Sequence, residues 1–420
     1  MNEGGAIPVR NGIPNIRHLR VFREVARCRR ISGAAEREHL SQPAATQAIA
    51  GLETRLDVAL FDRRPDGLYT TPIGDIFLLR ASRALEQLEI GAREATRIGL
   101  KARGRGFGSF DRLITAAQLR ALIAVVEARN YSLAGRTLGI SQPSVHRAAR
   151  NLERLSGITL FESAHEGVSP TPAAQVLAQH FKLALVELQQ GYEEIDEHLG
   201  IESAHIAVGT LPLARTFILP TAINAMVSST GGVQIRAVDG LYAELLRSLR
   251  HGDLDCIIGA LRNPSPADDV VQETLFDDPL AIVVGPGHPL IAHDAVTLAE
   301  VLRFPWVAPP KTTPAGSYLF DTLRIQDLAD TPVRVVSSSL ILIRGLLRMG
   351  DYITIISLHQ IRHELAEGSM VPLPVELENN SRPIGLTYRR DWRPTPTQTK
   401  FMEQIRLASR SAAQHLSKNQ

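Results

Sequence analysis

The feature that most constrains the fold is a repeat in the first half of the chain. Residues 19–72 and 119–172 align without a gap and are identical at about a third of their positions. The shared residues include Ser-Gln-Pro (41–43 and 141–143), Leu-Glu (52–53 and 152–153), Leu-Phe (60–61 and 160–161), glycine (67 and 167) and proline (72 and 172). Chance does not readily reproduce these identities at one spacing. The chain therefore carries two copies of one folding unit.

Each copy predicts three short helices followed by a hairpin. In the first copy, Leu19, Phe22 and Val25 fall on one helical face. Ser41 is a good N-cap, and Pro43 follows in the first turn, where a proline removes no hydrogen bond. Pro-Asp-Gly at 65–67 predicts the turn of the hairpin. This order is typical of a winged helix-turn-helix, whose second helix enters the major groove of DNA.

The charge of the chain is unevenly distributed. Residues 1–110 hold 18 basic and 12 acidic residues, a balance of +6, whereas residues 111–200 and 201–420 each have a balance of −2. A basic N-terminal part indicates a polyanionic partner for that end of the chain. Uneven surface charge without functional consequence explains the same numbers equally well.

Both copies resemble the N-terminal domain of LysR-type transcriptional regulators in the pattern of SQP, LE, LF, glycine and TP. The resemblance implies that residues 77–101 and 174–200 form linker helices that pair protomers into a dimer or tetramer. It also implies that the first copy binds promoter double-stranded DNA, with Arg63 and the adjacent Arg64 near the phosphates. RNA polymerase is a further partner to consider for such a regulator.

The two copies offer different groups to DNA. Gln pairs well with adenine, and Arg with guanine. The candidates in the first copy are Ser41, Gln42, Pro43, Thr46, Gln47, Arg63 and Arg64, and those in the second are Ser141, Gln142, His146, Arg147 and Arg150. The second copy lacks a wing cation, because Glu162 and Ser163 follow its Leu-Phe pair. DNA contact and a role in packing or dimerisation are therefore both open for this copy.

From His205 onwards, strands alternate with amphipathic helices, which predicts a parallel sheet. Helices are expected near 217–226, 243–250, 317–325, 340–349, 359–367 and 398–409. This half resembles the effector-binding domain of the same family, a two-lobed α/β fold of the type 2 periplasmic-binding-protein kind. The resemblance implies crossovers between the lobes near Phe276 and Pro374.

The same resemblance implies an effector in the cleft between the lobes, at strand ends and helix N-termini. The candidates by matching position are Thr210, Leu211, Pro212, Thr312, Thr313, Ser317, Ser337 and Ser338. Their hydroxyl groups indicate a small polar or anionic metabolite, and the stretch 308–324 is similar to regulators of sugar or aromatic-acid catabolism. Each of these residues could equally be an ordinary cap or turn residue.

No catalytic or metal motif stands out. There is no nucleophile elbow with a Ser-His-Asp set, no HExxH and no P-loop, so we expect neither an enzyme nor a cofactor. The glycines at 104, 106 and 108 follow no strand and predict a flexible basic linker instead of a nucleotide loop. His359 and His363 lie four apart on an expected helix, but no third metal ligand is evident, so no metal site is expected.

The setting expected from composition is the cytoplasm. Two cysteines, Cys28 and Cys256, are too few for a disulfide framework and fit a reducing compartment. The first 30 residues lack the apolar segment of a secretion signal, and Arg344 interrupts the best apolar run.

We therefore expect an α+β multi-domain protein, a DNA-binding regulator controlled by a small molecule. The expected parts are a flexible N-terminus (1–16), two winged helix-turn-helix domains (17–76 and 116–173), the two linker helices, a basic linker (102–115) and an effector domain (204–412). Its first lobe would comprise 204–276 and 375–412, and its second 277–374. The alternative is a small-molecule-binding protein whose second winged helix, or both, binds protein; a solute-binding transport protein is a further rival for the C-terminal fold alone.

Overall fold

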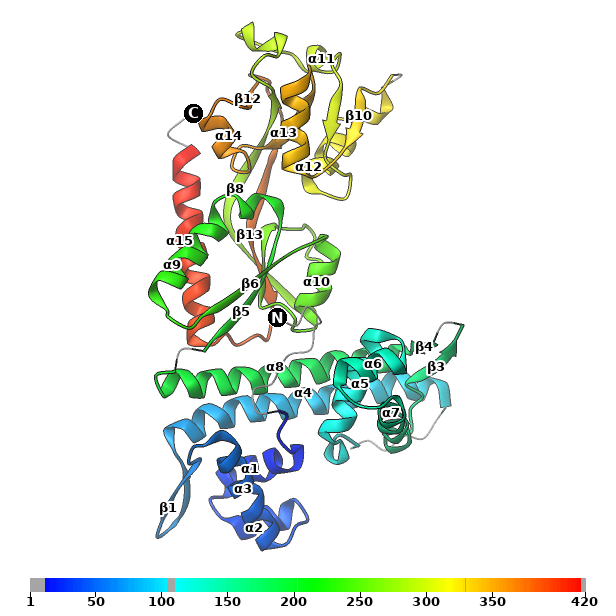
Figure 1. Ribbon diagram of the computed structural model, residues 1–420, viewed down its shortest axis with the longest axis vertical. Helices are drawn as coiled ribbons and strands as arrows, with labels where there is room; N and C mark the ends of the chain where they lie inside the picture. Colours follow the sequence, from blue (N-terminus) through cyan, green and yellow to red (C-terminus); the bar gives the residue numbers. More distant parts are fainter. Residues whose placement is uncertain (1–11, 104–109, 166, 202, 329, 417–420) are drawn as a thin grey trace. The chain divides into compact units, whose positions relative to one another are not determined.

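A computed structural model of the chain describes residues 12–103, 110–165, 167–201, 203–328 and 330–416 (Figure 1). It divides into two compact units, residues 1–204 with Arg250–Asp253, and the remainder from His205. Among the described residues, no helix has both the length and the apolar character needed to cross a membrane.

The first unit contains two winged helix-turn-helix domains, each followed by a long helix. The first domain comprises α1 (Ile16–Cys28), α2 (Ile31–Arg37), α3 (Gln42–Leu56), β1 (Phe61–Arg64) and β2 (Gly67–Thr70), and α4 (Pro72–Arg103) follows. The second comprises α5 (Ala116–Ala128), α6 (Tyr131–Leu138), α7 (Gln142–Ser156), β3 (Phe161–Ala164) and β4 (Gly167–Pro170), and α8 (Pro172–His198) follows. Both wings are antiparallel two-stranded hairpins.

The glycine shared by the two copies has one structural role. Gly67 and Gly167 open the second wing strand with positive φ angles of 151° and 116°. A Cβ atom at Gly67 would lie 2.8 Å from the carbonyl oxygen of Arg29, and one at Gly167 would lie 2.6 Å from that of Arg129. In each copy, the wing can pack against the end of the first helix only because this position is a glycine and has no side chain.

The two long helices pack against each other in antiparallel orientation within the one chain. Phe77, near the start of α4, has its ring 6.0 Å from that of Tyr192, near the end of α8. Further along α4, the side-chain oxygen of Gln87 lies 2.7 Å from Nδ1 of His180. These helices were predicted to pair protomers. In this chain, the described faces of α4 and α8 pack on each other.

The expected basic linker contains an ordered segment. Residues 104–109, with the three glycines, lie outside the described residues, as do residues 1–11 of the expected flexible N-terminus. Phe110–Leu113, however, forms a 3₁₀ helix (η1) in which Phe110 and Asp111 are buried. Asp111 accepts a hydrogen bond from Arg20 of α1 at 2.8 Å, so this part of the linker is fixed to the first domain.

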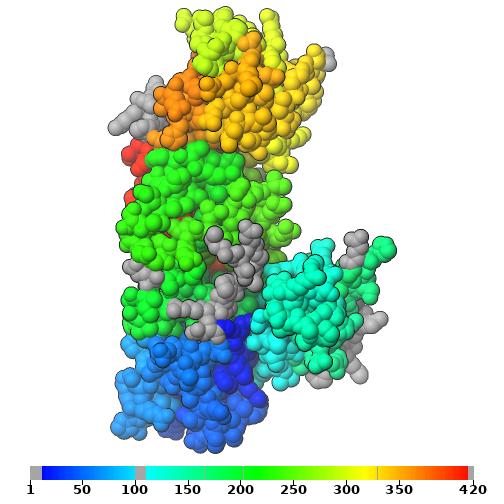
Figure 2. Space-filling model, in the orientation of Figure 1, coloured from blue at the N-terminus to red at the C-terminus, as the bar shows by residue number. Residues whose placement is uncertain are grey.

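The second unit is built on a sheet with strand order β10-β9-β11-β8-β13-β7-β5-β6, and β12 also pairs with β8. The strands are β5 (His205–Thr210), β6 (Gln234–Asp239), β7 (Cys256–Ala260), β8 (Val270–Val284), β9 (Trp306–Ala308), β10 (Val333–Val336), β11 (Ile353–Ser357), β12 (Val371–Pro372) and β13 (Ser381–Arg389). The long β8 joins two lobes, green and yellow to orange in Figure 2.

Helices cover the sheet of each lobe. They are α9 (Ile218–Ser229), α10 (Tyr242–Arg250), α11 (Leu298–Val301), α12 (Pro314–Ser317), α13 (Leu340–Met349), α14 (Arg362–Ala366) and α15 (Pro396–Leu416), with short 3₁₀ turns η2 (Pro212–Arg215), η3 (Pro289–Ala292) and η5 (Ile325–Asp327) and a π-helical turn η4 (Tyr318–Thr322). In the first lobe, α9 and α15 pack on one core that includes Met226 and Phe401. In the second, α13 packs on a core that includes Ile356.

Two expected helices differ from the structure. A single helix near 317–325 is replaced by α12, η4 and η5, since Thr313 caps α12 by accepting from Gly316 N at 3.1 Å and so starts the helix earlier. The helix expected at 359–367 is reduced to α14, so His359 and His363 do not share a helix. Among the described residues, no group of three or more His, Cys, Asp or Glu could hold a metal ion.

Candidate functional site

The recognition helix of the first copy, α3, presents a polar edge. Its buried residues are Ala45, Ala48, Ile49, Leu52 and Leu56. Gln42, Thr46 and Gln47 are exposed. Ser41 caps the helix as predicted, its hydroxyl accepting from Ala44 N at 3.4 Å, and the exposed Pro43 occupies the first turn. The exposed edge offers amide groups that can both donate to and accept from base edges.

The wing of the first copy adds two cations. Arg63 and Arg64 are exposed on β1, and the guanidinium of Arg64 lies 4.6 Å from the centre of the Tyr69 ring. The Tyr69 hydroxyl donates to Asp66 at 2.5 Å, which lowers the pKa of that carboxyl group. Tyr69 thus positions Arg64, while Arg63 faces solvent on a strand that can approach a phosphate.

The second recognition helix, α7, has a different exposed edge. Gln142, His146, Arg147 and Arg150 are exposed, and Arg150 pairs with Glu153 at 2.8 Å. The His146 ring lies 5.0 Å from that of Tyr131. Ser141 makes no cap hydrogen bond; its hydroxyl lies 2.9 Å from that of Ser144.

The second wing lacks the cations of the first. Ser163 and Ala164 are exposed on β3 at the positions that correspond to Arg63 and Arg64, while Glu162 corresponds to Asp62. The recognition helix of the second copy instead carries the exposed cations Arg147 and Arg150, which gives the two copies unlike surfaces.

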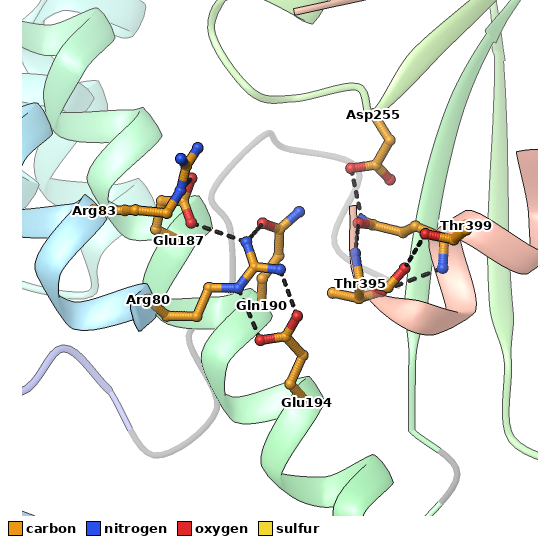
Figure 3. Close-up of polar contacts among 9 residues, drawn as sticks. Arg80, Arg83, Glu187, Gln190, Glu194, Asp255, Thr395 and Thr399 are labelled. Carbon is orange, nitrogen blue, oxygen red and sulfur yellow. Dashed lines mark hydrogen bonds and ion pairs between the residues drawn. The ribbon is translucent and has the colours of Figure 1, made fainter. Parts of the chain in front are cut away.

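A buried ion-pair network between α4 and α8 was not predicted from the sequence (Figure 3). The guanidinium of Arg80 is fully buried and donates to both carboxylate oxygens of Glu194 at 2.6 and 2.9 Å. It also donates to Glu187 at 2.9 Å and to Gln190 at 2.7 Å. Burial alone would lower the pKa of Arg80, but the carboxylates outweigh it and raise the pKa overall. In the sequence, Arg80 is one of many charged residues of α4, and nothing local sets it apart from the others.

In the second unit, the parallel strands of both lobes have their carboxyl ends at the boundary between the lobes. In the first lobe, β5 and β7 are parallel to each other, and β13 is antiparallel to both β7 and β8. In the second, β9 and β10 are parallel to β11, which is antiparallel to β8. Because β8 runs from the first lobe into the second, the strands β5 and β7 end facing the second lobe, and β9, β10 and β11 end facing the first.

The candidates of the first lobe lie at one of these ends. Thr210 is the last residue of β5, is buried, and its carbonyl accepts from Arg215 at 3.4 Å. Leu211 is half-buried, and its N–H donates to Ile258 O at 3.0 Å. Pro212 begins η2.

The candidates of the second lobe lie after β9 and β10. Thr313 caps α12, Ser317 donates to Asp321 at 2.9 Å, and Thr312 is exposed. The N–H of Ser337 donates to Ala308 O at 2.9 Å, which joins the end of β10 to the end of β9, and Ser338 is exposed beside it. Both sets therefore follow strands that end at the boundary between the lobes.

Three contacts across this boundary involve residues that were not predicted as part of the effector site. The hydroxyl of Thr216 donates to His359 O at 3.2 Å, and the guanidinium of Arg362 lies 3.9 Å from the centre of the Phe217 ring. The His359 ring lies 4.9 Å from that of Phe276. Burial, assisted by Arg362, lowers the pKa of His359 to about 4. Their positions directly after strands or at the start of a helix were the available signal.

The fold and these surfaces define a class of protein, a regulator with winged helix-turn-helix domains and a two-lobed effector domain. The comparisons agree with it. Residues 16–75 and 116–175 match the "Bacterial regulatory helix-turn-helix protein, lysR family", and residues 200–409 match the "LysR substrate binding domain".

The chain is 33% identical to the transcriptional regulator GalR of Pseudomonas putida over 94% of this chain and 97% of that one. It is 28% identical to PcaQ of Agrobacterium fabrum over 71% of this chain and 96% of that one. Full-length OxyR from Pseudomonas aeruginosa shares the fold, with a TM-score of 0.54, 21% identity, and coverage of 70% of this chain and 96% of that one. This chain belongs to the LysR family of DNA-binding transcriptional regulators, which supports the regulator over the protein-binding alternative.

Proposed function

We propose that the chain holds promoter DNA with its first winged helix and responds to a small polar or anionic effector between the lobes of the second unit. In this proposal Gln42, Thr46 and Gln47 face base edges, and Arg63 and Arg64 face phosphates. The observation that carries the proposal is that an uncharged polar helix edge and two exposed wing cations occur in the same copy. The basic balance of residues 1–110 supports it.

The test is a salt-titrated binding isotherm on one promoter fragment. Arg63→Ala should weaken binding to all sequences and flatten the salt dependence, because it removes a phosphate contact. Gln47→Ala should cost mainly specificity, about 1–3 kcal/mol of discrimination. Arg303→Ala, an exposed arginine of the second unit, is the matched control. Unchanged isotherms for both first-copy variants would refute the assignment.

The effector site is proposed at Thr210, Leu211 and Pro212 in one lobe, and at Thr312, Thr313, Ser317, Ser337 and Ser338 in the other. The facing strand ends support this placement. Arg215, whose side chain is 40% exposed, lies close to the Thr210 carbonyl and supports an anionic ligand, which would share this cation with Asp239 at 3.6 Å. Sugars and aromatic acids are the two classes of ligand proposed. Binding of the ligand would alter how the protomers of the oligomer are arranged, and this would change the bending of the promoter DNA.

Calorimetric titration with benzoate, hydroxybenzoates and glucose tests the effector site. We expect one class to bind, and Thr210→Ala combined with Thr313→Ala to weaken that binding while the affinity for DNA without ligand stays the same. Wild-type ligand affinity in the double variant would place the site elsewhere.

The remaining parts of the proposal follow from the family. The chain would act without catalysis, in the cytoplasm where the promoter is, with RNA polymerase as a partner. Self-association into dimers or tetramers would use surfaces beyond those that α4 and α8 bury on each other.

A further inference from the structure

The antiparallel pair of α4 and α8 is symmetric at the level of individual residues. Arg80 of α4 and His180 of α8 occupy equivalent positions in the repeat. Arg80 contacts Glu187 and Glu194 of α8. His180 in turn lies 2.7 Å from Gln87 and 3.5 Å from Glu94 of α4, which are the equivalents of those two residues.

The glycines of the pair repeat this relation. A Cβ atom on Gly91 would lie 2.6 Å from Cβ of His180, and one on its equivalent Gly191 would lie 3.0 Å from Cβ of Arg80. Three pairs of equivalent contacts thus relate the two copies. The relation is that of a twofold axis passing between the helices, as in an isologous dimer.

Each winged helix is attached at the equivalent end of its own long helix. The Phe22 ring of α1 lies 5.8 Å from that of Phe77 near the start of α4, and Lys182 in the first half of α8 donates to Glu127 of α5 at 2.7 Å. Because the long helices are antiparallel, the two winged helices lie at opposite ends of the pair (Figure 1). One chain therefore contains two DNA-reading domains related by an approximate twofold axis, the arrangement that suits two half-sites.

The second recognition helix remains available to a ligand. Gln142, His146 and Arg147 are exposed within the unit, so packing inside the chain does not occupy this edge of α7. Its reading groups differ from those of α3 at equivalent positions: His146 for Thr46, Arg147 for Gln47 and Arg150 for Ala50. Gln favours adenine and Arg favours guanine, so the two edges select different bases.

We propose that a single chain is a covalently joined pair of DNA-binding domains, and that it reads one operator composed of two unlike half-sites. The first copy reads one half through Gln47 and the second copy reads the other half through Arg147. Joining the copies makes their pairing intramolecular, which favours it over pairing between chains. This inference rests on the proposed binding of DNA by the first copy.

The test is selection of duplexes from a random-sequence DNA library by the full chain, followed by sequencing. We expect a motif with two different halves. Gln47→Arg should change the preferred base in one half, and Arg147→Gln should change it in the other, each by about tenfold or more at one position. Arg303→Ala should leave the motif unchanged. Because the swapped residues are both exposed, these variants are expected to fold, and hydrogen exchange of α3 and α7 checks this.

A palindrome of two identical halves that responds only to Gln47→Arg would overturn the inference, since it would mean that first copies of two chains pair on DNA. A motif with a single half, unchanged by Arg147→Gln, would overturn it too, while leaving the proposed function intact. Failure of any sequence to be enriched would instead overturn the proposed function itself.

Discussion

Glu53 and Glu153 make the same two hydrogen bonds in the two copies. Oε1 of Glu53 accepts from the N–H groups of Leu60 and Phe61 at 2.8 and 3.4 Å. Oε1 of Glu153 accepts from Leu160 and Phe161 at 2.9 and 3.1 Å. The repeated Leu-Glu and Leu-Phe pairs of the sequence are therefore the two ends of one contact, which fixes the recognition helix to the first strand of its wing.

Replacing either glutamate should loosen only its own wing. Glu53→Ala leaves two N–H groups without their acceptor, at a cost of about 1–3 kcal/mol. Hydrogen exchange of the β1–β2 and β3–β4 peptides measures this locally. We expect Glu53→Ala to speed exchange in the first wing and Glu153→Ala in the second, and equal effects of one variant on both wings would contradict this view.

The equivalent positions 80 and 180 should differ greatly in their contribution to stability. Arg80→Ala leaves the carboxylate of Glu194 without its cation and leaves Glu187 with Arg83 alone, at 2.8 Å, which should cost about 3–5 kcal/mol. His180→Ala removes a hydrogen bond to Gln87 and should cost about 1 kcal/mol. Exchange of the α4 and α8 peptides compares the two variants, and a larger effect of His180→Ala would refute the role given to the buried network.

Acid should destabilise the second unit through His359. The unfolded chain takes up a proton near the ordinary histidine pKa of about 6.5, whereas burial lowers the pKa in the folded protein to about 4. Between these values the unfolded state binds more protons, so stability falls as pH falls, by about 2 kcal/mol from pH 7.5 to pH 5.

Tryptophan fluorescence measures this loss in the second unit alone, because both tryptophans, Trp306 and Trp392, lie there. The difference in unfolding free energy between the two pH values should shrink by most of that amount in His359→Gln. An unchanged difference would show that His359 is not the group responsible.

Local signals in the sequence predicted the first unit well. Local residues define each winged helix: the cap at Ser41, the proline at 43 and the turn glycine at 67 each act within a few residues of their own position. Because the second copy repeats this pattern, both winged helices could be predicted. The exposed edge formed by Gln42, Thr46 and Gln47 followed from the same helical periodicity.

Contacts between segments that are far apart in the sequence could not be predicted from local signals. Glu194 lies 114 residues from Arg80, and nothing local to either residue indicates the pair. The same holds for Arg362 and Phe217 at the boundary between the lobes. Pairing of the linker helices was predicted, but sequence alone does not distinguish a partner in the same chain from one in another.

The most direct test of the single-chain pair uses cysteines at Gln87 and His180, whose side chains meet across α4 and α8. A short bismaleimide applied to Gln87→Cys combined with His180→Cys should join residues 87 and 180 within one chain, giving a cross-linked peptide from a species with the mass of one chain. Each single variant serves as the control for the native Cys28 and Cys256. If the same cross-linked peptide came only from a species with the mass of two chains, the long helices would pair between protomers and not within one chain.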